Sequence, residues 1–134
     1  MPLFDHERLE VYRVAIDFLA CADEVVAAFP SGRSYLADQL HRASTSIVLN
    51  IAEGAGEFSK KDKARFYRMA LRSATECAAV IDVCKCLHIG QESHLLAGRE
   101  MLLRIVAMLI RLVRRVGESG SGSGSGSGKT AERP

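Results

Sequence analysis

Residues 34–53 read SYLADQLHRASTSIVLNIAE, and the triplet Gly54-Ala55-Gly56 follows them. Apolar side chains recur in this stretch with the three- and four-residue spacing of a helix that buries one face. They are Leu36, Leu40, Ala43, Ile47 and Ile51. Glycine accepts the left-handed conformation that ends many helices, so we expect this helix to end after Glu53. No segment of the chain alternates apolar and polar residues as a half-buried strand does, which favours an all-α fold.

The same spacing predicts three more helices, which cover residues 5–28, 60–88 and 92–116. Ser59 is the expected N-cap of the third helix, with Asp62 as its capping-box partner. The expected breaks between helices are Pro30-Ser31-Gly32, the Gly54-Ala55-Gly56 triplet and Gly90. Short connections between long helices force neighbours to run in opposite directions. The sequence therefore predicts an up-down-up-down antiparallel four-helix bundle.

The composition of the 134-residue chain divides at residue 117. Residues 1–116 form a body long enough for one hydrophobic core and too short for two. Residues 117–134 are rich in Gly and Ser and are predicted to form a flexible tether. Composition leaves open whether this tail is natural or an engineered linker. Hydrophobic residues make up 48% and charged residues 25% of the chain, which excludes an intrinsically disordered protein.

The four cysteines, Cys21, Cys77, Cys84 and Cys86, lie in apolar helical patterns. They have no Cys-x-x-Cys spacing and no secretory leader before them, so we expect reduced thiols in a cytoplasmic protein. Cys84 and His88 have the i, i+4 spacing that can hold a soft metal. A structural zinc site usually has four ligands, so we favour a row of buried thiols and predict no metal and no cofactor. Arginines interrupt the longest apolar stretch, 101–116, so no membrane span is expected.

The apolar side chains of the fourth predicted helix cover more of its circumference than one neighbouring surface needs. At 100° per residue they spread over roughly 220° of arc, whereas a helix packed on one side needs little more than 100°. The third helix carries a second apolar stripe formed by Met69, Val80, Val83 and Leu87. Such a band would make a monomer prone to aggregate, so we expect a homo-oligomer that buries it. The alternative is that loops or the tail cover the band.

A stripe of polar residues runs beside the apolar face of the second helix and continues on the third. Its members are Gln39, Arg42, Ser46, Asn50 and Glu53, with Ser73 and Glu76. A half-buried polar group must be hydrogen-bonded or costs about 1–3 kcal/mol, so the stripe predicts a structural network that fixes helix register. The alternative is an active site with Glu53 as acid or base. Because neither a nucleophile with its base nor a paired carboxylate accompanies Glu53, we predict no catalytic residues and no enzymatic activity.

Basic residues gather on the third and fourth predicted helices. The third carries Lys60, Lys61, Lys63, Arg65, Arg68 and Arg72, and the fourth carries Arg104, Arg111, Arg114 and Arg115. Repeated around an oligomer, these basic stripes would form a positive surface able to bind the phosphates of RNA or DNA. The alternative is a solvated face that only keeps the protein soluble. The net charge of +2 does not decide between the two, because clustering matters more than the sum.

The span 39–76 is similar to a known family. The run Ser46-Ile47-Val48-Leu49-Asn50-Ile51-Ala52-Glu53-Gly54, with Gln39, Arg42, Ser59, Phe66, Ala70, Ser73 and Glu76 around it, resembles the four-helix-bundle proteins encoded in intervening sequences of bacterial 23S ribosomal RNA genes. The opening with Phe4, Leu9 and Val11 is similar too, so the likeness covers nearly all of the body. This chain has Arg72 where the family usually has glycine, which adds charge at that point.

The resemblance implies a cytoplasmic up-down bundle that assembles as a homopentameric ring and has no established enzymatic activity. A related group resembles the accessory proteins of diversity-generating retroelements, which are basic pentamers that partner a reverse transcriptase and nucleic acid. Our first hypothesis is therefore a non-catalytic, homo-oligomeric accessory factor that binds RNA or DNA through the basic stripes. The alternatives are a structural adaptor that binds another protein, such as a reverse transcriptase, and a small enzyme that uses Glu53.

Overall fold

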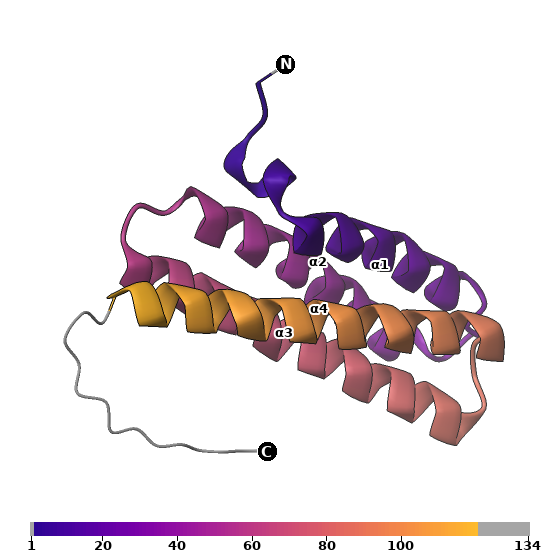
Figure 1. Ribbon diagram of the computed structural model, residues 1–134. Helices are drawn as coiled ribbons and strands as arrows, with labels where there is room; N and C mark the ends of the chain where they lie inside the picture. Colours follow the sequence, from indigo (N-terminus) through magenta and orange to yellow (C-terminus); the bar gives the residue numbers. More distant parts are fainter. Residues whose placement is uncertain (1, 121–134) are drawn as a thin grey trace, which may run out of the picture.

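The computed structural model describes residues 2–120, and within them it contains helices and no strand. A short 3-10 helix, η1 (Asp5–Arg8), precedes four long helices, α1 (Glu10–Ala27), α2 (Ser34–Gly56), α3 (Lys60–Leu87) and α4 (Glu92–Gly120). Each long helix packs against its neighbour in sequence, and α1 also packs against α4 (Figure 1). The predicted all-α class with four helices is confirmed. The Ser-Gly tail from residue 121 onward lies outside the described residues.

The N-terminal region differs from the single helix predicted over residues 5–28. Leu9 adopts an extended conformation, with φ −93° and ψ 128°, and separates η1 from α1. The carboxylate of Glu7 accepts a hydrogen bond of 2.7 Å from the backbone N–H of Phe4. This contact closes η1 as a separate turn, and such local side-chain bonds compete with a continuous helix.

The predicted end of the second helix at Glu53 is wrong, because α2 continues through Gly54 to Gly56. Neither glycine takes a positive φ, in contrast to Gly32 and Gly90 in the loops. α3 begins at its N-cap Ser59, whose hydroxyl accepts from the Asp62 backbone N–H at 3.1 Å. The helix ends before His88, which adopts the left-handed conformation with φ 58°. α4 extends to Gly120, beyond the end predicted near Val116.

The core lies between the four helices and is formed mainly by aliphatic side chains, with the rings of Phe18 and Tyr67. Its largest fully buried apolar side chains include Phe18, Leu40, Ile47, Ile51, Ile81, Ile105 and Leu109. Contacts between neighbouring helices run in opposite residue order along the two helices of a pair. Gln39 and Ser46 of α2 meet Glu76 and Ser73 of α3, respectively. In α1 and α4, Glu10 meets Arg104, and Cys21 meets His94.

Three of the four thiols are buried, and the fourth, Cys86, is exposed. Burial, with the Glu76 carboxylate adding to it, raises the pKa of Cys77 to about 12. Burial also raises the pKa of Cys21 and of Cys84. His88 is exposed and follows the last residue of α3, whereas Cys84 is buried. No group of three or more potential metal ligands occurs within the described part of the chain. Within residues 2–120, no helix is both long enough and apolar enough to cross a membrane.

These pKa shifts predict that a thiol reagent at about pH 8 modifies Cys86 quickly and the three buried cysteines only after unfolding. A colorimetric disulfide reagent should therefore show one fast equivalent, which Cys86→Ser removes. The shift at Cys77 also makes stability fall with pH, because its unfolded thiol ionises near 9.0 while the folded thiol stays protonated until about 12. The contribution of the protonated Cys77 thiol to stability is complete below pH 9 and is lost towards pH 12.

In the thiol-reagent experiment, two or more fast equivalents would contradict this description of the core.

Candidate nucleic-acid interface

A polar seam joins α2 to α3 at the edge of their buried interface. The Ser73 hydroxyl donates to the Ser46 hydroxyl at 2.9 Å. The Asn50 amide donates to both the hydroxyl and the carbonyl of Ser46, each at 2.9 Å. One turn further along α3 and two turns back along α2, the Gln39 amide donates to the Glu76 carboxylate at 3.2 Å. These side chains link two helices in a fixed register, as a structural network requires.

Two residues of the predicted polar stripe lie outside this seam. Arg42 and Glu53 are both exposed, and no hydrogen bond between described residues joins either side chain to it. At 100° per residue, both point well over 100° away from the centre of the buried face of α2, whereas Asn50 lies nearer to it. Ser46 and Asn50 are both partly buried. Glu53 is therefore a surface carboxylate without the burial that tunes an acid or base for catalysis.

Two residues of α3, Lys63 and Tyr67, contact the last turn of α2, and neither contact was predicted from the sequence. The Lys63 ammonium donates to the carbonyls of Gly54 at 3.2 Å and Ala55 at 2.9 Å. Lys63 thus satisfies helix-terminal acceptors, and its charge does not belong to the solvent-facing stripe. A Cβ at Gly54 would lie 2.7 Å from the ring of Tyr67, so glycine permits this close approach. Burial, with Asp5 adding to it, raises the pKa of Tyr67.

The remaining cations of α3 form a ridge of Lys61, Arg65, Arg68 and Arg72, all of them exposed. Their spacing of four, three and four residues places them on one side of the helix over about 16 Å. The three arginines line an open groove that also includes Ser46, Asn50 and Ser73 of the polar seam. Arg65 Nε lies 3.9 Å from Asp62 Oδ1. The Arg65 guanidinium also lies over the Phe66 ring, with its Cζ 4.5 Å from the ring centroid. No ion pair between described residues holds the other three cations.

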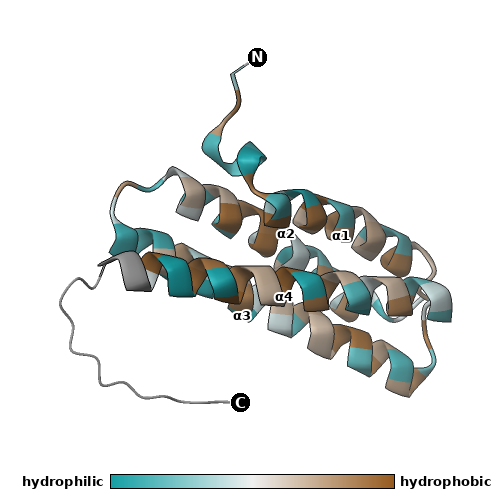
Figure 2. Ribbon diagram, viewed as in Figure 1, coloured by the Kyte–Doolittle hydropathy of each residue, from teal (hydrophilic) through white to brown (hydrophobic). Residues whose placement is uncertain are grey.

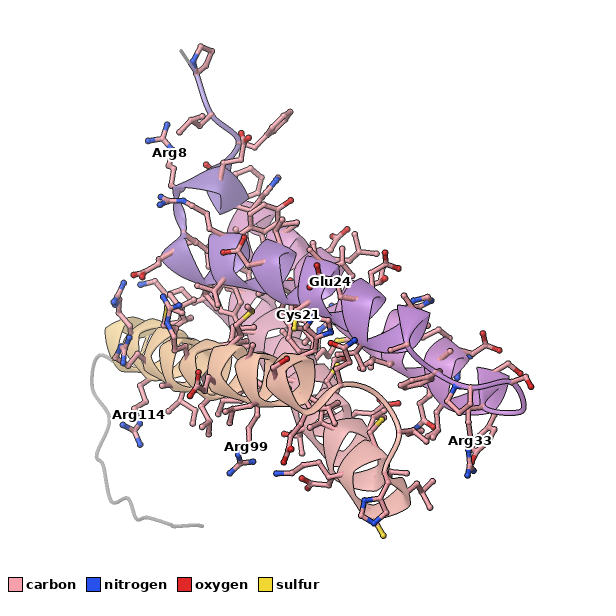
Figure 3. The ribbon with its side chains drawn as sticks, turned by 90° about the vertical axis from the view of Figure 1, so that its right-hand side faces the viewer. Arg8, Cys21, Glu24, Arg33, Arg99 and Arg114 are labelled. Atoms are coloured by element: carbon pink, nitrogen blue, oxygen red, sulfur yellow. The ribbon has the colours of Figure 1, made fainter. Side chains whose placement is uncertain are left out.

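Some of the basic residues of α4 contact or adjoin residues of η1 and α1. Arg104 donates to the Glu10 carboxylate of α1 at 3.4 Å, which offsets its charge. Arg111 and Arg115 line a recess together with Arg8, which comes from η1. Arg8 was not among the predicted basic residues, because its place beside α4 depends on the unpredicted break at Leu9. Arg99 and Arg114 project from α4 away from the bundle (Figure 3).

The fold brings these basic residues together at one end of the molecule. The connection between α2 and α3 and the C-terminal part of α4 lie at the same end in Figure 1. Figure 3 shows Arg8 and Arg114 towards this end and Arg33 at the opposite one. We define the basic end as Arg8, Lys60, Lys61, Arg65, Arg68, Arg111, Arg114 and Arg115. Acidic residues predominate at the opposite end, where the loops and helix termini carry Asp23, Glu24, Asp38, Asp82 and Glu92 against Arg33 and Lys85. The basic end also contains Asp5, Glu7, Glu57 and Asp62, so the bundle is polarised by an excess of one sign of charge at each end.

An apolar stripe runs along the outward side of α4. Leu96 is 56% exposed, Leu103 57% and Ile110 36%, and they are spaced seven residues apart. Figure 2 shows apolar and polar residues alternating along α4. Val106 and Val113, three residues after Leu103 and Ile110, are partly buried, so the exposed band is narrower than predicted. On α3 the predicted stripe retains Met69, Val83 and Leu87, each 38–39% exposed, whereas Val80 is buried.

The fold and these surfaces define an all-helical protein with four long helices, a hydrogen-bonded polar seam and a basic end. A protein-family model described as 23S rRNA-intervening sequence protein matches residues 7–111. The chain belongs to this family. No curated protein matches the chain.

Proposed function

We propose that this protein is a non-catalytic, homo-oligomeric accessory factor that binds RNA or DNA through its basic end. The observation that carries the proposal is the convergence of cations from η1, α3 and α4 at one end of a bundle whose other end is acidic. A cluster of this kind attracts a polyanion even when the net charge of the chain is only +2. Nucleic-acid phosphates release counterions when such a cluster neutralises them, which supplies the binding free energy.

The proposed assembly is a ring of antiparallel four-helix bundles that contact one another through α4. The opposite order of contacts between α1 and α4, and between α2 and α3, supports an up-down-up-down antiparallel bundle. The seven-residue spacing of Leu96, Leu103 and Ile110 is the spacing at which one helix packs along another. A second copy that covers this stripe would remove three large apolar side chains from water. A closed ring, with a pentamer as the number that the family resemblance implies, would repeat the basic end around its axis.

The non-catalytic part of the proposal is supported by the chemistry of the carboxylate, hydroxyl, amide and thiol groups. Glu53 is exposed, and the polar seam consists of neutral hydroxyl and amide groups together with the Gln39–Glu76 contact. The buried thiols of Cys21, Cys77 and Cys84 have raised pKa values, which disfavours the nucleophilic thiolate.

The proposal predicts that replacing Arg68, Arg111 and Arg114 by Gln weakens binding of a structured RNA at least tenfold. The slope of log K against log salt should decrease by about 2–3, because each lost phosphate contact removes roughly 0.7–0.9. Fluorescence anisotropy over a salt series measures both quantities. The matched control replaces Arg33, Arg42 and Arg99 by Gln, which removes the same charge elsewhere and should change affinity less than threefold.

Equal losses in the two triple variants would mean that net charge, and not the basic end, attracts the nucleic acid. Binding that is absent, or insensitive to salt, in the unaltered protein would instead favour the adaptor function, in which another protein such as a reverse transcriptase is the partner.

A further inference from the structure

An aromatic side chain stands uncovered at the basic end. Phe58 is 100% exposed, the highest value among the large apolar residues of the described chain. It lies between the last residue of α2, Gly56, and the first residue of α3, Lys60. Leaving a phenylalanine in water forgoes the stabilisation that its burial would give, and a ring in this position is available to a ligand.

The loop that carries Phe58 is fixed on both sides by hydrogen bonds. The Glu57 N–H donates to the Gly54 carbonyl at 3.3 Å, and the Lys63 N–H donates to the Ser59 carbonyl at 2.9 Å. The Lys63 ammonium also joins the end of α2 to α3. The backbone position of Phe58 at the start of α3 is therefore set by the fold, so the loop itself does not have to become ordered when the ring binds a ligand.

The basic ridge begins beside this ring. Lys61 follows Phe58 by three residues, and the ridge continues through Arg65 and Arg68 to Arg72. Cations placed along a helix track a phosphate backbone, and a neighbouring aromatic ring offers a face on which a base can stack. The Arg65 guanidinium is already stacked on the Phe66 ring, and its outward face offers a second planar surface.

We propose that Phe58 and the ridge of Lys61, Arg65, Arg68 and Arg72 form a site for single-stranded nucleic acid. An unpaired base stacks on the Phe58 ring, and the adjoining phosphates lie along the ridge. A duplex occludes the faces of its bases within its own stack, so it contacts the cations and leaves Phe58 uncovered. This inference rests on the proposed nucleic-acid function and identifies the form of nucleic acid that it selects.

The chain contains no tryptophan, so Phe58→Trp introduces a single indole reporter at the site. Oligothymidylate of about 12 nucleotides, within the usual range of single-strand sites, should quench its fluorescence and bind as tightly as it binds the unaltered protein. A duplex of equal length should bind through the cations without quenching. Phe58→Ala should weaken oligothymidylate binding roughly 5- to 100-fold, the loss of one stacked base, with an unchanged salt slope and unchanged duplex affinity.

Leu49→Ala, which removes another exposed apolar side chain, is the control and should leave both affinities unchanged. Equal effects of Phe58→Ala on single strand and duplex, or no effect on either, would overturn the inference while leaving the proposed function in place. A smaller assembly mass for Phe58→Ala would overturn it as well, because the ring would then be covered by another copy. If the unaltered protein binds neither nucleic acid, the proposed function and the inference both fail.

Discussion

Replacing Leu103 by glutamate is expected to dissociate the proposed homo-oligomer into folded single copies. Leu103 is the middle member of the α4 stripe and is 57% exposed in the single chain. The substitution removes the apolar surface that assembly would bury and places an unpaired carboxylate in the interface. Together these effects cost about 4 kcal/mol per interface, which corresponds to a roughly thousandfold weaker association. Sedimentation at micromolar concentration measures the mass, and far-ultraviolet circular dichroism checks that the helices remain.

Leu49 of α2 provides a matched control, because it is 58% exposed and lies on another helix. Leu49→Glu makes the same chemical change at the same exposure and should leave the mass of the assembly unchanged. Leu103→Glu protein that folds and retains the mass of the unaltered assembly would rule out the α4 stripe as the contact. Dissociation by both variants would indicate an interface that also includes α2.

The helices could be predicted from the sequence because each depends on local periodicity. Residues of α2 such as Leu40, Ile47 and Ile51 repeat at helical spacing, and all three are fully buried. The end of α2 could not be predicted in this way. Gly54 would normally favour a helix end, but Lys63 and Tyr67 of another helix keep it helical, and a single-helix pattern does not contain that information.

The candidate site shows the same division between local and long-range information. Ser46, Asn50 and Ser73 could be identified because polar residues beside an apolar face need partners, and the structure joins them. The stripes of basic residues were visible in the sequence, but their meeting at one end, with Arg8, depends on how α3, α4 and η1 pack. The role of Lys63 was hidden for the same reason, since a charge count cannot separate a capping lysine from a solvated one.

Gly54→Val should lower the free energy of unfolding by about 3 kcal/mol, whereas the same change at Gly56 should shift it by less than about 0.5 kcal/mol. The Cβ at Gly54 would lie 2.7 Å and 2.9 Å from two ring carbons of Tyr67, and Tyr67 is only 3% exposed. The ring cannot move aside without disturbing the core, so the added methyl groups force apart α2 and α3. No atom lies within 4 Å of a Cβ at Gly56, so helix propensity alone governs that substitution.

Denaturant unfolding of the two variants measures the difference, and a double-mutant cycle locates its origin. Tyr67→Ala destabilises the protein by itself, because it leaves a cavity in place of a buried ring. If the ring is what opposes Val at position 54, the double variant should be more stable than the sum of the two single losses by about 1–3 kcal/mol. Additive losses would show that Gly54 is required by the backbone of α2 itself. The close approach of α2 and α3 would then not explain why the Asn-Ile-Ala-Glu-Gly run ends in glycine.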